Sequence, residues 1–182
     1  MNFTIRIALV FALVVPLWSQ APTDATVSIP PNAGIYYRSP SGWVLFRAQF
    51  LFPFSVGGFR DLVSSHRRGK VEIPGPTAEF RITEPRPTFS VRGLSPRTGL
   101  YLVRTQQEQD YREVRVSIPR DVYRWAQFRR GDLTDLDVES VSTDTVRVRP
   151  RADLSPGEYV LVSDFAPQYR AFHVAAPFSV SK

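Results

Sequence analysis

Short apolar runs separated by turn residues make up most of this chain. The runs are rich in Val, Ile, Tyr, Phe and Leu, which favour β-strands, and the prolines that fall between them exclude long helices. Short strands at this spacing predict an all-β fold, an antiparallel β-sandwich of the immunoglobulin-like kind. The predicted strands cover residues 34–38, 43–50, 70–73, 79–83, 88–92, 100–104, 111–118, 135–141, 145–149, 159–163 and 170–175.

One segment has the spacing of a helix instead. Val122, Trp125 and Ala126 recur at i, i+3 and i+4, with a proline before the segment and a glycine after it. This pattern predicts a single short helix around residues 120–130.

The segments 135–139 and 147–151 predict a hairpin whose register is fixed by charge. Acidic residues alternate with apolar ones in the first segment, and arginines alternate with apolar residues in the second. We interpret this as a solvated charge ladder, in which each cross-strand pair contributes about 0.2–1 kcal/mol; an anion-binding arginine ribbon is the alternative. With a turn at residues 142–144, the partners are Glu139 and Arg147, Asp137 and Arg149, Asp135 and Arg151 on the charged face, and Val138 and Val148, Leu136 and Pro150 on a core face.

The N-terminal segment is typical of an export signal. Arg6 supplies a positive charge, residues 7–18 are apolar, and small residues precede a cleavage site near Ala21. The apolar run is too short to span a bilayer, which takes about 20 residues. We therefore predict a signal peptide at 1–21, one β-sandwich domain at 22–182 without a transmembrane segment, and a secreted or periplasmic location.

Composition excludes several classes of protein. The chain has 182 residues, 43% of them hydrophobic and 13% aromatic, which is too apolar for general disorder. It contains no cysteine, so disulfide-stapled miniproteins, zinc–thiolate domains and thiol enzymes are excluded. The formal net charge is +6, and all cationic residues except Lys70 and Lys182 are arginines. Whether this excess of arginine is functional or merely compositional is left open by the sequence.

One short motif carries a family resemblance. The segment Leu154-Ser155-Pro156-Gly157-Glu158-Tyr159 is similar to the Leu-x-Pro-Gly-x-Tyr segment near the end of many bacterial immunoglobulin-like and prealbumin-like domains. The resemblance covers residues 154–161 and implies a Pro-Gly turn that leads into a late strand, whose tyrosine packs across the sandwich. It implies no activity, because such folds host many functions.

A basic cluster at residues 65–70 is the first candidate binding site. It has no nearby carboxylate in the sequence and lies between a glycine-containing stretch and a strand, so we expect a loop. Arg67, Arg68 and Lys70 would there contact a phosphate, a lipid headgroup or an acidic polysaccharide. The alternative is an ordinary solvated loop.

An aromatic segment is the second candidate. Phe50, Phe52 and Phe54 would line one face of a strand, and Pro53 restricts that strand to an edge or a bulge. The rings are expected in the core; if they are exposed, they form an edge for docking a protein partner.

Catalytic chemistry has little support in the sequence. The chain has two histidines, His66 and His173, and no nucleophile elbow, zinc-protease motif or phosphate-binding loop. We predict no catalytic residues, no metal site and no cofactor, and export makes nucleic acid an unexpected ligand. The sequence favours a non-catalytic binding protein whose partner is a protein, or an anionic polysaccharide or lipid surface; a small glycan-active hydrolase with paired carboxylates is the alternative.

Overall fold

Almost all regular structure in the described part of the chain is β-strand. The exception in the described part is one turn of 3-10 helix, η2 (Arg130–Asp132), and no helix there has the length and apolarity needed to cross a bilayer. The computed structural model describes residues 28–46, 51–55, 66–93, 99–119, 126–163, 165–166, 171–172 and 175–181. The predicted all-β fold of antiparallel sheets, consistent with a β-sandwich, is confirmed.

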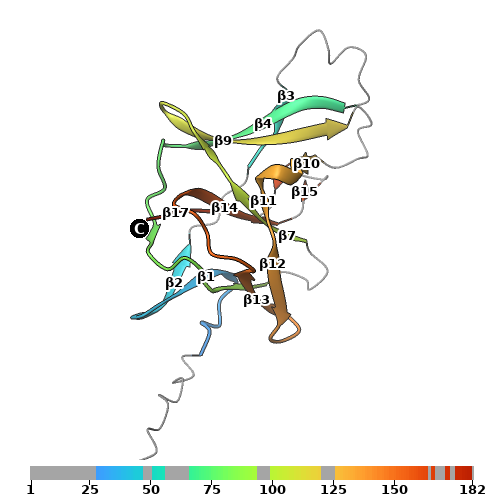
Figure 1. Ribbon diagram of the computed structural model, residues 1–182. Helices are drawn as coiled ribbons and strands as arrows, with labels where there is room; N and C mark the ends of the chain where they lie inside the picture. Colours follow the sequence, from blue (N-terminus) through green and yellow to red (C-terminus); the bar gives the residue numbers. More distant parts are fainter. Residues whose placement is uncertain are drawn as a thin grey trace, which may run out of the picture.

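The described residues form three five-stranded sheets and one small two-stranded sheet, and we name the three large sheets by their position in Figure 1. Among the described strands, all pairs are antiparallel except that of β17 with β5. In the lower sheet the order is β12 (Leu136–Ser140), β13 (Thr145–Pro150), β6 (Phe89–Arg92), β1 (Gly34–Ser39) and β2 (Gly42–Phe46). In the central sheet it is β11 (Leu133–Thr134), β7 (Leu100–Arg104), β14 (Gly157–Ser163), β17 (Ala175–Val180) and β5 (Arg81–Ile82).

The upper sheet is built around one long pair of strands. Its order is β10 (Gln127–Phe128), β9 (Tyr111–Pro119), β4 (His66–Pro74) and β3 (Phe54–Ser55), and β8 (Gln106–Gln107) also pairs with β9. A small hairpin of β15 (Phe165–Ala166) and β16 (Ala171–Phe172) forms a separate two-stranded sheet.

Both faces of the central sheet are buried, and this divides the apolar interior into two cores. On β14, Tyr159 and Leu161 belong to the core shared with the lower sheet, which also contains Phe89 and Phe178. Their neighbours Val160 and Val162 belong to the core shared with the upper sheet, which also contains Val71, Ile73, Val114 and Val116. The molecule is therefore three layers thick, with the central sheet in the middle (Figure 1).

The late strand begins as the motif resemblance implies. Gly157 has a φ of 155°, and Tyr159 is buried, stacked on Phe178 at a ring separation of 5.8 Å. The Tyr159 hydroxyl donates a hydrogen bond to Ser155 O at 2.8 Å. This bond ties the start of β14 to the turn that precedes it.

The predicted register of the charge ladder is confirmed: Glu139 is opposite Arg147 and Asp137 is opposite Arg149, as the turn at residues 142–144 requires. Glu139 forms the predicted ion pair with Arg147, but Asp137 forms its ion pair with Arg151, at 2.8 Å, instead of with Arg149. The face assigned to the core is only partly buried, because Val148 is fully buried but Val138 is 53% exposed. Since β12 is the edge of the lower sheet, its outer residues have no further strand to cover them.

Three other predictions are corrected. The helix around residues 120–130 does not extend over Gln127–Phe128, which form strand β10; residues 120–125 lie outside the described part. The predicted strand at 170–175 contains the short strand β16 (Ala171–Phe172), and the final strand β17 (Ala175–Val180) was not predicted beyond its first residue. The basic cluster is not a loop but the first half of β4, which begins at His66. The predicted signal peptide lies outside the described residues.

Candidate functional site

The predicted basic cluster lies on β4 in the upper sheet. The sequence does not show a strand pattern here because of Gly69. Gly69 occupies an inward position, where an apolar residue would be expected, and the side chain of Ile118 fills the space instead. A Cβ at Gly69 would overlap Ile118 and lie 3.0 Å from Phe54 O. The missing apolar residue is therefore supplied by the neighbouring strand.

Lys70 is held by a network that the sequence did not indicate. Its Nζ lies 2.7 Å from Glu72 and 3.5 Å from Glu113, and it donates a hydrogen bond to the Tyr111 hydroxyl at 3.2 Å. It also lies over two rings, 5.3 Å from the centroid of Phe54 and 5.0 Å from that of Tyr111. The hydrogen bonds to Glu72 and Tyr111 raise the pKa of Lys70, because they stabilise its charged form. The expectation that this cluster has no nearby carboxylate is wrong for Lys70.

The two described phenylalanines of the aromatic segment are exposed. Phe52 is 61% exposed and Phe54 is 42% exposed, so their expected place in the core is wrong. Leu51, which precedes Phe52, is buried instead, with 3% of its surface exposed. Phe50 lies outside the described residues.

The structure thus places most of the predicted site residues on one sheet. Phe54 is opposite Lys70 in the pairing of β3 with β4, and exposed Arg67 and Arg68 precede Lys70 on the same strand. Because side chains alternate along a strand, Arg68 shares the face of Lys70, whereas Arg67 lies on the face of Gly69. Together with Phe52 we call these residues the upper-sheet surface. Lys70 is held by its internal network, and Arg67, Arg68, Phe52 and Phe54 are the exposed members of this surface.

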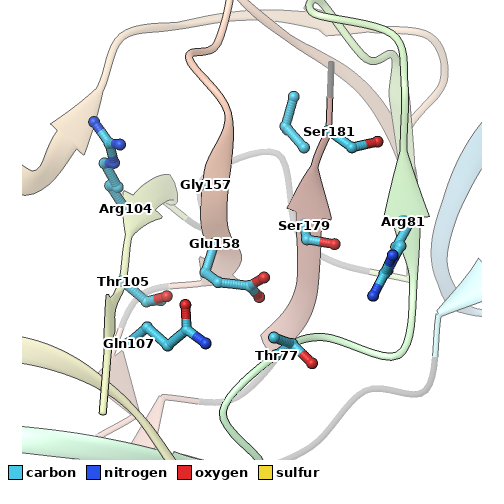
Figure 2. A pocket seen from close by; sticks show the side chains of 10 residues that line it. Thr77, Arg81, Arg104, Thr105, Gln107, Gly157, Glu158, Ser179 and Ser181 are labelled. Atoms are coloured by element: carbon cyan, nitrogen blue, oxygen red, sulfur yellow. The ribbon is translucent and has the colours of Figure 1, made fainter.

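A second site, which the sequence did not indicate, lies at one end of the central sheet. It is a hollow of about 420 Å³ bordered by the ends of β7, β14 and β17, by β5 and by the segment before β5. Figure 2 shows its lining side chains, with Arg104 at the rim turned away from the others. The lining residues are Thr77, Arg81, Arg104, Thr105, Gln107, Gly157, Glu158, Ser179, Val180 and Ser181.

Glu158 and Arg112 form a buried ion pair beside this hollow. Their side chains are 10% and 3% exposed, and Arg112 Nη1 lies 3.5 Å from Glu158 Oε2. The same carboxylate oxygen accepts a 2.8 Å hydrogen bond from the backbone N–H of Ala78. Burial lowers the pKa of Arg112, and the charge of Glu158 opposes this shift.

Backbone carbonyls complete the cage around the buried guanidinium. Arg112 donates to Gly75 O and Pro74 O, both at 3.1 Å. A buried charge is tolerated only when it is paired and hydrogen-bonded in this way. The pair therefore fixes the position of Glu158 at the wall of the hollow.

The alternation of inward and outward residues along β9 indicates one member of this pair. Arg112 stands two positions before Val114 and four before Val116, so it belongs to the inward face. An arginine at an inward position predicts a buried partner. The sequence does not identify that partner, because Glu158 is 46 positions away from Arg112.

The described residues contain no group of three or more His, Asp or Glu side chains arranged to hold a metal ion. Comparisons of the chain with protein-family models, with curated proteins and with solved structures found no match. The geometry of the two sites is therefore the basis on which a function is assigned.

Proposed function

We propose that this chain is an exported, non-catalytic binding protein whose upper-sheet surface holds an anionic polysaccharide of the cell envelope. The observation that carries the proposal is the exposure of Phe52 and Phe54 at the edge of the upper sheet, where the neighbouring strand β4 carries the exposed Arg68 on the face of Lys70. Exposed large aromatic side chains mark interaction surfaces on folded domains. Aromatic rings stack on the apolar faces of sugars, and arginines bind carboxylate or phosphate groups through paired N–H donors.

Export rests on the predicted signal peptide and is tested separately. Mass spectrometry of the protein recovered from the periplasm or the medium should give an N-terminus near Pro22. A chain that stays in the cytoplasm and still carries its first 21 residues would contradict this part of the proposal.

Binding is tested with polygalacturonate as the anionic probe and dextran as its neutral control, at 20 mM and at 150 mM salt. Because exposed charges are screened by salt, we expect binding to polygalacturonate to weaken as salt rises. The double variant Arg67→Ala/Arg68→Ala should weaken it by roughly 5- to 30-fold, since two surface contacts contribute about 1–2 kcal/mol together. The matched control is Arg147→Ala/Arg149→Ala on the lower sheet, which removes the same charge.

Equal losses in the two double variants would mean that binding follows net charge alone, and would contradict the proposed surface. Phe52→Ala/Phe54→Ala tests the rings: a loss of polygalacturonate binding that salt does not change is expected. Binding only to phosphatidylglycerol vesicles would favour a lipid surface instead. Binding of a protein that depends on Phe52 and Phe54 alone and does not change with salt concentration would favour a protein partner.

The hydrolase alternative is less well supported by the geometry of the hollow. Among the residues that line it, Glu158 is the only carboxylate, and it is tied to Arg112. Glycoside hydrolysis ordinarily needs two carboxyl groups on either side of the scissile bond. Release of reducing ends from a polysaccharide, abolished by Glu158→Gln, would replace the binding proposal with an enzymatic one.

We also propose that the lower and central sheets form a sandwich of the immunoglobulin-like kind. The bond from the Tyr159 hydroxyl to Ser155 O supports this, because such sandwiches often contain a tyrosine that binds the backbone a few residues upstream. An experimental structure in which this bond is missing would count against the proposal.

A further inference from the structure

We propose that the hollow at the end of the central sheet is a second binding site, specific for a sugar acid, with Arg81 holding the acid's carboxylate. The site is separate from the upper-sheet surface and would stand if binding of a polymer there failed. Its volume of about 420 Å³ lies in the range of pockets that hold small ligands.

The base of the hollow is a polar row that crosses three strands, β14, β17 and β5, and begins at Thr105, the residue after β7. The N–H of Thr105 donates to Glu158 O at 2.9 Å, Glu158 pairs with Ser179, and Ser179 pairs with Arg81. This row continues the face that carries Val160 and Val162 in the upper core. At the end of that face the apolar residues give way to hydroxyl, carboxylate and guanidinium groups. Packing of the core does not require the side chains to change from apolar to polar at the end of this face. The polar side chains there suit a ligand with many hydroxyl groups.

The charge of the site favours an anion. Glu158 is neutralised by Arg112 and by the N–H of Ala78, so it does not offer a net negative charge to an ammonium group. Arg81 is exposed on the other wall, and within the described part of the chain it forms no ion pair. A guanidinium binds a carboxylate through two parallel N–H donors. A ligand with one carboxylate therefore fits better than a cation or a zwitterion.

The remaining side chains match sugar hydroxyl groups. Thr77, Ser179 and Ser181 provide hydroxyls, Gln107 provides an amide, and Glu158 provides a fixed acceptor (Figure 2). Ser179 makes only a 3.5 Å hydrogen bond, to Phe80 O, so its hydroxyl is available for a shorter one.

The hydroxyl of Thr105 is an independent sign of a ligand. The residue is 7% exposed, and within the described part its Oγ1 is buried without a hydrogen-bond partner. An unsatisfied buried hydroxyl costs about 1–3 kcal/mol. In Figure 2 its oxygen points toward the side of the hollow that Gln107 borders, so a ligand would reach it by displacing this exposed side chain.

The test is isothermal titration of the purified chain with glucuronate and galacturonate, with glucose as the neutral control, at low salt. We expect binding of at least one uronate and none of glucose. Arg81→Gln should weaken uronate binding by about 10- to 100-fold, and Arg81→Lys by less, because it keeps the charge but loses the paired donors. Arg149→Gln, on the lower sheet, is the matched control and should leave binding unchanged.

Three outcomes would overturn the proposal: no binding of either uronate, equal binding of uronate and glucose, or unchanged binding in Arg81→Gln. The variant Arg67→Ala/Arg68→Ala should keep its uronate affinity, which separates this site from the upper-sheet surface. Loss of uronate binding in that variant would also contradict the proposal.

Thr105→Val tests the buried hydroxyl in a way that a structural role would not mimic. Valine has nearly the same shape and removes the unsatisfied group, so the free protein should be as stable as before or more stable. If the hydroxyl meets the ligand, the same variant should bind uronate several-fold more weakly. Unchanged uronate affinity in Thr105→Val would contradict the assignment of this hydroxyl to the site.

Discussion

Arg112 carries its charge into the space between two sheets, and its environment determines what its replacement would do. Arg112→Met leaves Glu158 buried without its cation, so we expect the free energy of unfolding to fall by about 3–5 kcal/mol. Denaturation in urea measures this loss. Adding Glu158→Gln should recover part of it, because the uncompensated charge is removed.

The exposed Arg149 is the control for this prediction. Arg149→Met should change the free energy of unfolding by less than about 0.5 kcal/mol. A loss in Arg112→Met that is no larger than this would show that the pair contributes little.

Asp144 gives the protein a pH-dependent contact at the turn between β12 and β13. Hydrogen bonds from the Ser142 and Thr145 hydroxyls, at 2.6 and 2.8 Å, lower the pKa of Asp144 to about 2, and Arg92 at 3.1 Å acts in the same direction. Because the pKa is lower in the folded state, the contribution to stability is present above the unfolded value near 4. It is lost as the pH falls through about 2.

We therefore expect the free energy of unfolding to decrease between pH 4 and pH 2 by more in the wild type than in Asp144→Asn. Urea titrations at a series of pH values measure the difference. Parallel pH profiles for the two proteins would contradict the prediction.

At the scale of elements, the β12–β13 hairpin allows the contributions of an ion pair and of a buried side chain to the free energy of unfolding to be compared. The Arg147–Glu139 ion pair is 3.1 Å long but exposed, whereas Val148 is fully buried. Val148→Ala should lower the free energy of unfolding by about 2–3 kcal/mol, since it removes buried methyl groups and leaves a cavity. Glu139→Ala should cost less than about 1 kcal/mol. Chemical denaturation of both variants tests the comparison, and equal costs would contradict it.

This hairpin also shows what the sequence predicts well. Its charged and apolar alternations agree, so the register followed from residues 135–151 alone. The strand at the basic cluster was hidden for the opposite reason: the inward position at Gly69 is filled by Ile118 from another strand. A pattern within one strand does not reveal a side chain that a neighbour contributes.

The candidate site was predictable only to the extent that its residues are close in sequence. Arg67, Arg68 and Lys70 share one strand and were found together, although the contacts of Lys70 with Glu113 and Tyr111 were not. The hollow combines residues from 77 to 181, and strand order alone brings them together. No local alternation encodes that order.

At the scale of the whole molecule, the central sheet couples the two cores. Adjacent residues Val160 and Leu161 of β14 face opposite cores, and each is fully buried. We expect Val160→Ala and Leu161→Ala each to lower the midpoint temperature of one shared unfolding transition, because neither core keeps its shape without β14. Scanning calorimetry tests this; two separate transitions in either variant would show that the layers unfold independently.

The position of β17 has a consequence for the order in which the chain acquires its structure. Residues 175–180 lie between β14 and β5, so their partners include a segment almost a hundred positions earlier. Contacts between residues so far apart in the sequence form slowly, because the long loop between them loses conformational entropy when it closes. During synthesis the lower core would lack Phe178 until nearly all of these 182 residues had left the ribosome. The lower core would therefore be completed late, after most of its other strands have been synthesised.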